Sequence, residues 1–108
     1  MLPKHLRLPA RMIPLVAYKG KKSVGKYLEV RAELDVRMKY PLFAITVTTK
    51  TSKNAVVRNK IRRQLKVEIE RLVTAGKVKQ GRYIVLVRSN LAVEADLISE
   101  LDNQLAAL

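Results

Sequence analysis

The chain has 108 residues, of which 48% are hydrophobic and 29% charged, a length and balance that fit one packed domain and exclude wholesale disorder. The absence of cysteine excludes disulfides and thiolate metal sites, and the single histidine, His5, leaves little scope for metal or general-base chemistry. A net charge of +13 and a pI near 10.4 predict an extended polyanionic partner. We therefore expect one domain over residues 1–108 that binds a nucleic acid and has no small-molecule substrate.

The N-terminal segment gives no sign of export. Residues 1–10 include basic side chains but lack the continuous apolar stretch of a signal peptide, and no apolar run in the chain approaches the length of a membrane span. We expect a cytoplasmic protein without a membrane partner.

The positive charge is distributed unevenly along the chain. Residues 1–63 contain sixteen lysines and arginines against three acids, Glu29, Glu33 and Asp35, whereas residues 64–108 contain six bases and six acids. The first part therefore carries the whole net charge. Charge that served solubility alone would be spread over the surface, so this asymmetry predicts a field that steers and docks a nucleic acid.

The first half of the chain contains the signals of a short helix followed by strands. Pro9 and Pro14 flank residues 10–13, and the apolar residues that follow favour a short helix with Pro14 near its start. Residues 27–36 alternate between apolar and charged side chains, which is the period of a half-buried strand, and we allow for a turn there. Residues 42–49 are rich in β-branched side chains and predict a further strand.

A long helix is predicted between Asn54 and Gly76. The Asn54 side chain can accept a hydrogen bond from the first turn, and Gly76 suits the position just after a helix end. One stripe of apolar residues recurs at spacings of four and three, so it should face the core: Val57, Ile61, Leu65, Ile69 and Leu72. At about 100° per residue, an adjoining arc carries Asn59, Arg62, Arg63 and Lys66.

The remaining segments predict a central strand and a closing helix. Residues 83–87 form a continuous apolar run of strand length, which is typical of a strand that is covered on both faces. Residues 97–108 repeat leucine and isoleucine at helical spacing, with acids opposite. The predicted fold class is α+β, in the order α-β-β-β-α-β-α.

The region from Lys50 to Lys66 contains seven cations and no acid. An ordinary charged surface is the simplest explanation for an isolated basic run. However, like charges three or four residues apart on a helix repel one another, so a folded domain gains nothing from this arrangement. A bound polyanion relieves the repulsion, and the asymmetry of the whole chain favours that interpretation.

The segment Ala55-Val56-Val57-Arg58-Asn59-Lys60-Ile61-Arg62-Arg63 resembles the basic helix motif of the bacterial ribonuclease P protein. The preceding residues 45–54 are similar to the family's strand ending in Ser-Lys-Lys, and residues 83–88 look like its next strand. The likeness is good over residues 43–88. It implies a small mixed sheet with an unusual left-handed β-α-β crossover through the basic helix, which residue spacing could not reveal. Lysines stand at positions 60 and 66, where the family usually has arginine.

The resemblance implies two RNA-binding surfaces. The first contacts the catalytic RNA or the substrate through Lys50, Lys53, Arg58, Asn59, Lys60, Arg62, Arg63 and Lys66. The second is a cleft between the sheet and the first helix that takes the 5′ leader of precursor tRNA. By position, the residues that could line that cleft are Tyr18, Tyr27, Val47 and Lys50. The phenylalanines usual in the family's first helix are absent, and Ile13 and Tyr18 are the nearest candidates to replace them. A basic groove with aromatic platforms holds single strands without reading sequence.

As implied by this resemblance, the chain is the protein subunit of ribonuclease P, an endoribonuclease that matures the 5′ end of tRNA. The RNA subunit cleaves the phosphodiester with bound Mg²⁺, and the protein alone should be inactive, with no catalytic or metal-ligating residue of its own. A ribosomal or ribosome-associated RNA-binding protein remains an alternative. A helix-turn-helix DNA binder lacks its partner helix, and a protein-only nuclease would need a carboxylate cluster that the sequence does not show.

Overall fold

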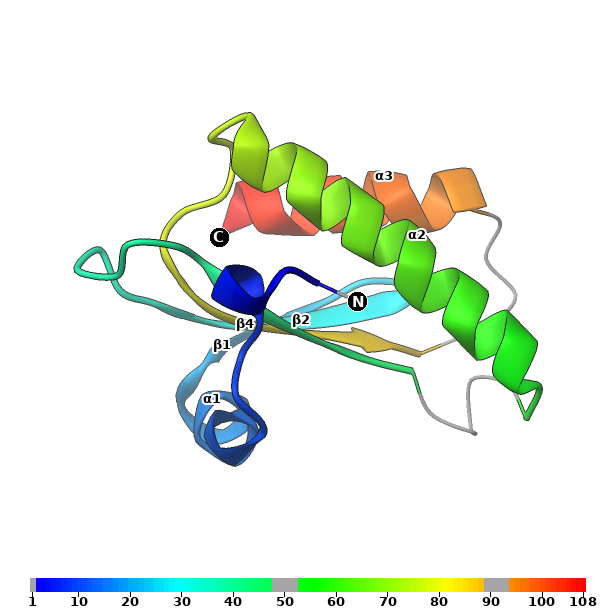
Figure 1. Cartoon of the computed structure of the whole chain (residues 1–108), viewed down its shortest axis with the longest axis horizontal. Coiled ribbons are helices and arrows are strands. Elements are labelled where there is room, and N and C mark those ends of the chain that lie inside the picture. The colour runs from blue at the N-terminus through cyan, green and yellow to red at the C-terminus, as the bar shows by residue number, and fades with distance from the viewer. Residues whose placement is uncertain (1, 48–52, 89–93) are drawn as a thin grey trace.

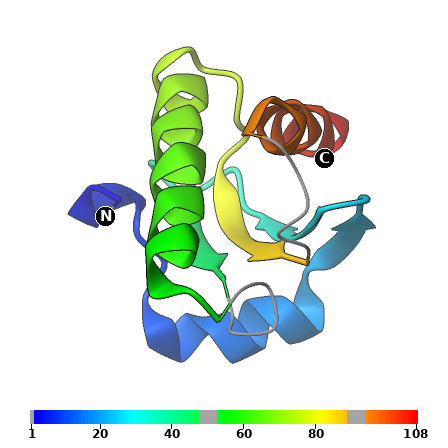
Figure 2. The same ribbon diagram turned by 90° about the vertical axis from the view of Figure 1, so that its right-hand side faces the viewer.

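The computed structural model describes residues 2–47, 53–88 and 94–108. Two short 3₁₀ turns, Lys4–Leu6 (η1) and Ala10–Met12 (η2), precede the regular elements. These elements are α1 (Ile13–Lys19), β1 (Lys21–Val24), β2 (Leu28–Leu34), β3 (Leu42–Thr46), α2 (Ala55–Thr74), β4 (Gly81–Val87) and α3 (Glu94–Ala107). In Figures 1 and 2, α2 and α3 cover one face of the sheet and α1 crosses the other.

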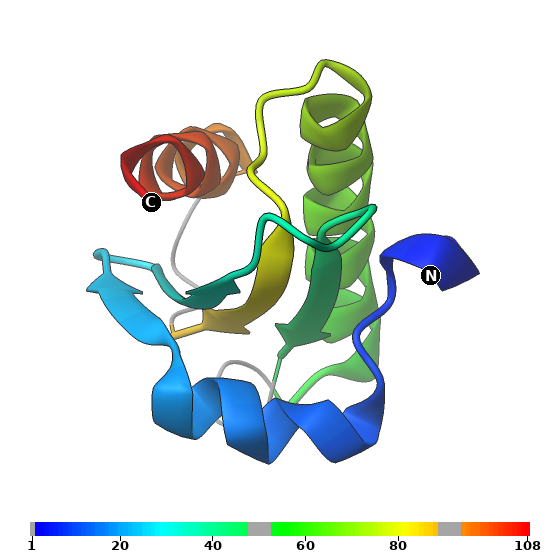
Figure 3. The ribbon, with the colours of Figure 1, turned by 90° about the vertical axis from the view of Figure 1, so that its left-hand side faces the viewer.

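The sheet is mixed, with strand order β1-β2-β4-β3. The pairs β1–β2 and β2–β4 are antiparallel, whereas β3 and β4 are parallel neighbours connected through α2. In Figure 3 the strands β3 and β4 run away from the viewer, β3 lies to the right of β4, and α2 lies above the sheet. Seen along the strands in this view, the path from β3 through α2 to β4 runs anticlockwise. The crossover is therefore left-handed, a form that most proteins avoid. The predicted fold class and element order are confirmed.

The core lies mainly between the sheet and the two longer helices. Alternate residues of β2 and β4 point towards α2 and α3, including Leu28, Val30 and Val85, each with no exposed surface. Phe43 and Tyr83 stack in this layer with ring centroids 4.9 Å apart. A smaller cluster around Val16 and Ile84 packs beneath α1. Because helices cover both faces, β4 is the central strand that its apolar sequence predicted.

The boundaries of α2 follow its local sequence. The Asn54 side chain accepts a hydrogen bond of 2.9 Å from the Val56 amide, and Gly76 adopts a φ of 70°, as predicted for the two ends. The predicted stripe is buried at Ile61, Leu65, Ile69 and Leu72, but Val57 is 36% exposed because it lies in the first turn, beyond the main contact with the sheet.

The structure corrects the predicted strand over residues 27–36. The first strand is β1, upstream of that segment, and the β1–β2 turn lies at residues 25–27. The strand β2 ends at Leu34, so Val36 lies beyond it and is 85% exposed. The backbone amides of Tyr27 and Leu28 donate to the carboxylate of Glu100 on α3, which fixes the turn from a distant part of the chain. The sequence of residues 27–36 alone gives no indication of this contact with α3.

Two acids meet where α2 packs on α3. Arg71 donates to both carboxylate oxygens of Glu68, over 2.8 and 2.5 Å, and this hydrogen bonding lowers the pKa of Glu68 despite its burial. Burial raises the pKa of Asp102 to about 6, and the hydrogen bond and charge of Glu68 act in the same direction. The folded protein therefore keeps a proton on Asp102 in a pH range where the unfolded chain has lost it.

Replacing Asp102 with asparagine should change how stability depends on pH. Between about pH 4 and 6 the folded state binds more protons at Asp102 than the unfolded state, so this group makes the free energy of unfolding fall as pH rises. Asparagine imitates the protonated acid and does not titrate. We expect urea unfolding to show Asp102→Asn gaining stability relative to the parent protein as pH rises through this range. Glu70→Gln, a matched change outside the pair, is the control. A constant difference across the range would contradict the assignment.

Within the described residues, none of the helices combines the length and apolar character needed to cross a membrane.

Candidate nucleic-acid interface

The first half of α2 presents a dense cationic surface. Packing of the apolar stripe on the sheet leaves Asn59, Lys60, Arg62 and Arg63 exposed, while Arg58 and Lys66 are half-buried. Lys53, just before the helix, is also exposed. Lys50 lies outside the described residues. The predicted RNA-binding residues that can be placed thus lie on or beside one helix, and the acids of α2 begin only at Glu68.

A cleft of about 590 Å³ adjoins this surface. It lies between α2, the edge strand β3 and the N-terminal segment, which Figures 2 and 3 show beside α2 at the margin of the sheet. Its lining residues are Leu2, Arg7, Leu8, Phe43, Ala44, Ile45, Asn59, Arg62, Arg63 and Lys66. Four of them are cations and none is an acid. The cations of such a site attract anions. Its apolar lining can also contact the apolar part of a bound ligand, which a flat charged surface cannot do.

Arg62 and Arg7 are held in place by backbone carbonyls. Arg62 donates to the Val47 carbonyl and to Asn59 Oδ1, each over 3.0 Å, so it ties α2 to the end of β3. Arg7 donates to the Leu2 carbonyl over 3.0 Å. A guanidinium has five N–H donors, so both side chains keep further donors for a phosphate while paying little additional side-chain entropy on binding.

Arg7 was not among the predicted site residues. It reaches the cleft because the N-terminal segment runs parallel to β3, where Arg7 pairs with Phe43 and the Leu8 amide donates to the Phe43 carbonyl over 2.9 Å. A signal that the sequence offered was its place in the basic first part of the chain.

The four candidates for the 5′-leader cleft that the structure describes lie on two different faces of the sheet. Ile13 packs in the small cluster beneath α1, and Tyr18 projects from α1 with 88% of its surface exposed. Val47 is buried in the main core on the opposite face, where Tyr27 also packs. Lys26 Nζ lies 5.3 Å from the Tyr27 ring. The four residues therefore do not line one cleft, and only Ile13 and Tyr18 belong to α1.

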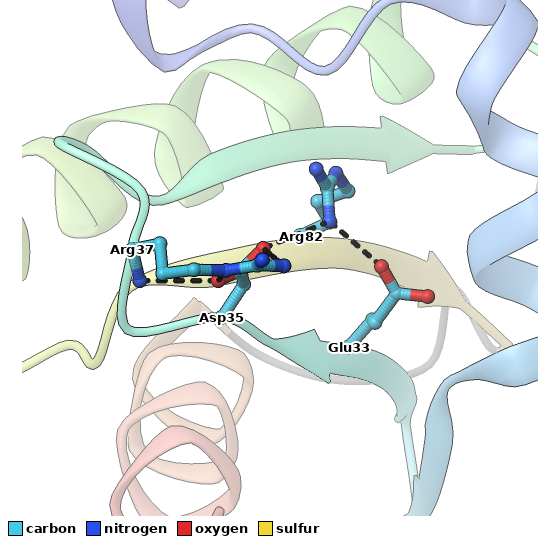
Figure 4. Close-up of polar contacts among 4 residues, drawn as sticks. All are labelled: Glu33, Asp35, Arg37 and Arg82. Atoms are coloured by element: carbon cyan, nitrogen blue, oxygen red, sulfur yellow. Dashed lines mark hydrogen bonds and ion pairs between the residues drawn. The ribbon is translucent and has the colours of Figure 1, made fainter.

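The acids of the basic first part of the chain are engaged by basic side chains. Arg82 contacts Glu33 at 2.7 Å and Asp35 at 3.8 Å, and Arg37 closes on Asp35 from the other side, as Figure 4 shows. The hydrogen bonds from Arg37 lower the pKa of Asp35. The positive charge that these acids do not neutralise is therefore carried by other lysines and arginines, such as those of α2.

Glu29 completes this neutralisation beneath α1. Burial pushes the pKa of Glu29 upwards, but the hydrogen bond and charge of Arg31, assisted by Lys22, outweigh burial and lower it. Arg31 also donates to the Ala17 carbonyl over 3.1 Å, which fixes the end of α1 against the sheet. Among the described residues no three acidic, histidine or cysteine side chains gather in a way that could hold a metal ion.

These features define an RNA-binding α+β domain in which a basic helix joins two parallel strands. The family model Ribonuclease P matches residues 2–108. A curated relative, the ribonuclease P protein component of Pseudanabaena sp. (strain PCC 6903), is 34% identical over 93 residues, which cover 85% of this chain and 78% of the relative.

Solved structures share the fold. A mutant of the Staphylococcus aureus RNase P protein superposes with a TM-score of 0.85 at 20% identity, covering 96% of this chain and 88% of that one. The RNase P protein from Thermotoga maritima, in complex with 1-(4-fluorophenyl)-2-thiourea, has a TM-score of 0.84 at 24% identity, covering 94% and 99%.

The chain belongs to the ribonuclease P protein family. It is a protein component of an endoribonuclease holoenzyme that acts in tRNA processing, and its partner is the ribonuclease P RNA. The predicted function is confirmed, and these findings do not support the ribosomal alternative.

Proposed function

We propose that this chain supplies the phosphate-binding surface of a holoenzyme in which the RNA subunit carries out catalysis. The observation that supports this most directly is the acid-free cationic surface of α2 and the adjoining cleft. Phosphate contacts from lysine and arginine give most of the affinity for a nucleic acid without reading its sequence. The contact residues that we assign are Lys53, Arg58, Asn59, Lys60, Arg62, Arg63 and Lys66, with Lys50 as a further candidate.

Precursor tRNA is the substrate in this proposal, and its 5′ leader passes along α1. Tyr18 is the side chain best placed to receive an unpaired base, because it is 88% exposed and the basic residues Lys19 and Lys21 follow it in the sequence. Stacking on such a ring is worth about 1–3 kcal/mol per base. Ile13, the first residue of α1, packs α1 against the small cluster on the sheet. Val47 and Tyr27 do not belong to this surface, because they pack on the other face of the sheet.

Mg²⁺ belongs to the RNA in this proposal. The acids Glu29, Glu33 and Asp35 are all held in ion pairs with lysine or arginine, so they do not form a ligand set for a hard cation. The chain's own contribution is to neutralise phosphates and to orient the leader.

Reconstitution with a ribonuclease P RNA tests this function. At low magnesium, adding the protein should stimulate cleavage of precursor tRNA by the RNA, because lysines and arginines replace part of the screening that the metal provides. The protein without RNA should give no cleavage. Tyr18→Ala should weaken binding of precursor tRNA more than binding of mature tRNA, whereas Tyr40→Ala, a matched loss of a partly exposed ring away from α1, should not. Failure of the protein to stimulate the matching RNA would refute the proposed function.

A further inference from the structure

The cleft beside β3 combines two kinds of surface. Its cations are Arg7, Arg62, Arg63 and Lys66, whereas its other side is apolar and includes Leu2 and Ile45, which pack with the main core. A phosphate alone would need only the cations, and an apolar side chain would need only the apolar part. A group that carries a flat, largely apolar ring next to a phosphate matches both.

The edge of β3 adds hydrogen-bonding groups to the same cleft. Because β3 is the last strand of the sheet, the backbone groups of alternate residues point away from β4. The carbonyl of Phe43 takes the Leu8 amide, which identifies Phe43 as outward-facing, and the alternation places the amide and carbonyl of Ile45 on the same edge. A donor and an acceptor side by side can bond the edge of any nucleobase.

The dimensions and rigidity of the cleft suit one such ligand. Its volume of about 590 Å³ is that of a small-ligand pocket. Arg62 is already fixed by Asn59 and the Val47 carbonyl, and Arg7 by the Leu2 carbonyl, so two of the cations are oriented before anything binds. Preorganised donors lose little entropy on binding.

We propose that this cleft holds a single unstacked nucleotide of an RNA strand, with its base on the apolar side against the β3 edge and its phosphate on the arginines. The assignment of the strand to the ribonuclease P RNA rests on the proposed function. The chemistry of the cleft does not depend on that assignment. In this arrangement α2 binds the backbone of the RNA over its length, while the cleft anchors one position by capturing a base.

The test is an NMR titration of the full chain with AMP, adenosine and inorganic phosphate. We expect AMP to bind with a Kd on the order of 1 mM, which is a reachable affinity for a ligand with that number of atoms. AMP should shift the methyl signals of Leu2 and Ile45 together with the side-chain signals of Arg62 and Arg63. Phosphate should shift the arginine signals alone, and adenosine should bind more weakly than AMP because it lacks the charge.

Charge variants separate this cleft from general attraction to a basic protein. Arg63→Gln should weaken AMP binding about tenfold, since it removes a charge-assisted hydrogen bond. Lys21→Gln, the same charge change on β1 at the opposite edge of the sheet, should have no effect on the methyl shifts. The NMR spectrum of each variant reports directly whether it folds.

The proposal is overturned if AMP and phosphate produce the same shifts, or if AMP leaves the signals of Leu2 and Ile45 unchanged. Either result would leave the reconstitution experiment untouched, because α2 could still bind phosphates without capturing a base. Conversely, a failure to stimulate ribonuclease P RNA would refute the proposed function while the response to AMP could still be observed.

Discussion

Binding of this chain to ribonuclease P RNA should weaken about 10³-fold or more when the salt concentration rises from 50 to 200 mM. The reason is release of counterions, since each phosphate contact adds about 0.7–0.9 to the slope of log affinity against log salt. The described part of the chain offers six cations for such contacts on or just before α2: Lys53, Arg58, Lys60, Arg62, Arg63 and Lys66. Fluorescence anisotropy with labelled RNA over this salt range measures the slope. A flat response would contradict the role given to α2.

A pair of double variants shows whether the slope comes from α2. Arg63→Gln with Lys66→Gln should reduce its magnitude by about 1.4–1.8, the share of two lost phosphate contacts. Lys21→Gln with Lys79→Gln removes the same net charge from β1 and from the loop before β4, and it should leave the slope close to that of the parent chain. Equal effects of the two pairs would show that total charge, and not the basic surface of α2, determines the binding. Arg62 is unsuitable for this purpose because it also supports the end of β3.

The helix α2 could be predicted from the sequence because its signals are local. Asn54 and Gly76 mark its ends by their own backbone chemistry, and the spacing from Ile61 to Leu72 identifies its buried side. The cationic surface followed from the same periodicity, since the residues beside a buried stripe must flank it in space. Within the described residues, the predicted positions of the basic side chains therefore agree with the structure.

The cleft and the α1 surface could not be predicted in the same way, because they depend on contacts between distant segments. Arg7 enters the cleft through its pairing with Phe43, which lies 36 positions later in the chain. The position of Val47 could have been inferred, because residues 43, 45 and 47 share one side of an extended strand and Phe43 is the natural core residue among them. The handedness of the crossover came from the family resemblance alone, since physical rules favour the opposite hand.

Leu65→Ala should cost about 2–5 kcal/mol in the free energy of unfolding. Leu65 has no exposed surface and packs in the main core, where α2 meets the sheet, so truncation loses apolar burial and leaves a cavity that the surrounding strands cannot fully close. This is a large share of the stability of a domain of this size, which is typically about 5–15 kcal/mol. Urea unfolding without RNA is the appropriate measurement, because a bound ligand would raise the apparent stability.

Val67→Ala provides the matched control for this core substitution. Val67 lies on the same helix but is 59% exposed, and alanine favours helix formation, so the change in unfolding free energy should stay within about 0.5 kcal/mol. If both variants lost the same stability, α2 would be stabilised mainly by its own helical propensity. If only Leu65→Ala is destabilised, packing of α2 on the sheet is what holds the helix and its basic surface in place. Weaker RNA binding by Leu65→Ala, with every cation retained, would then show that the phosphate contacts require α2 to be held in one orientation.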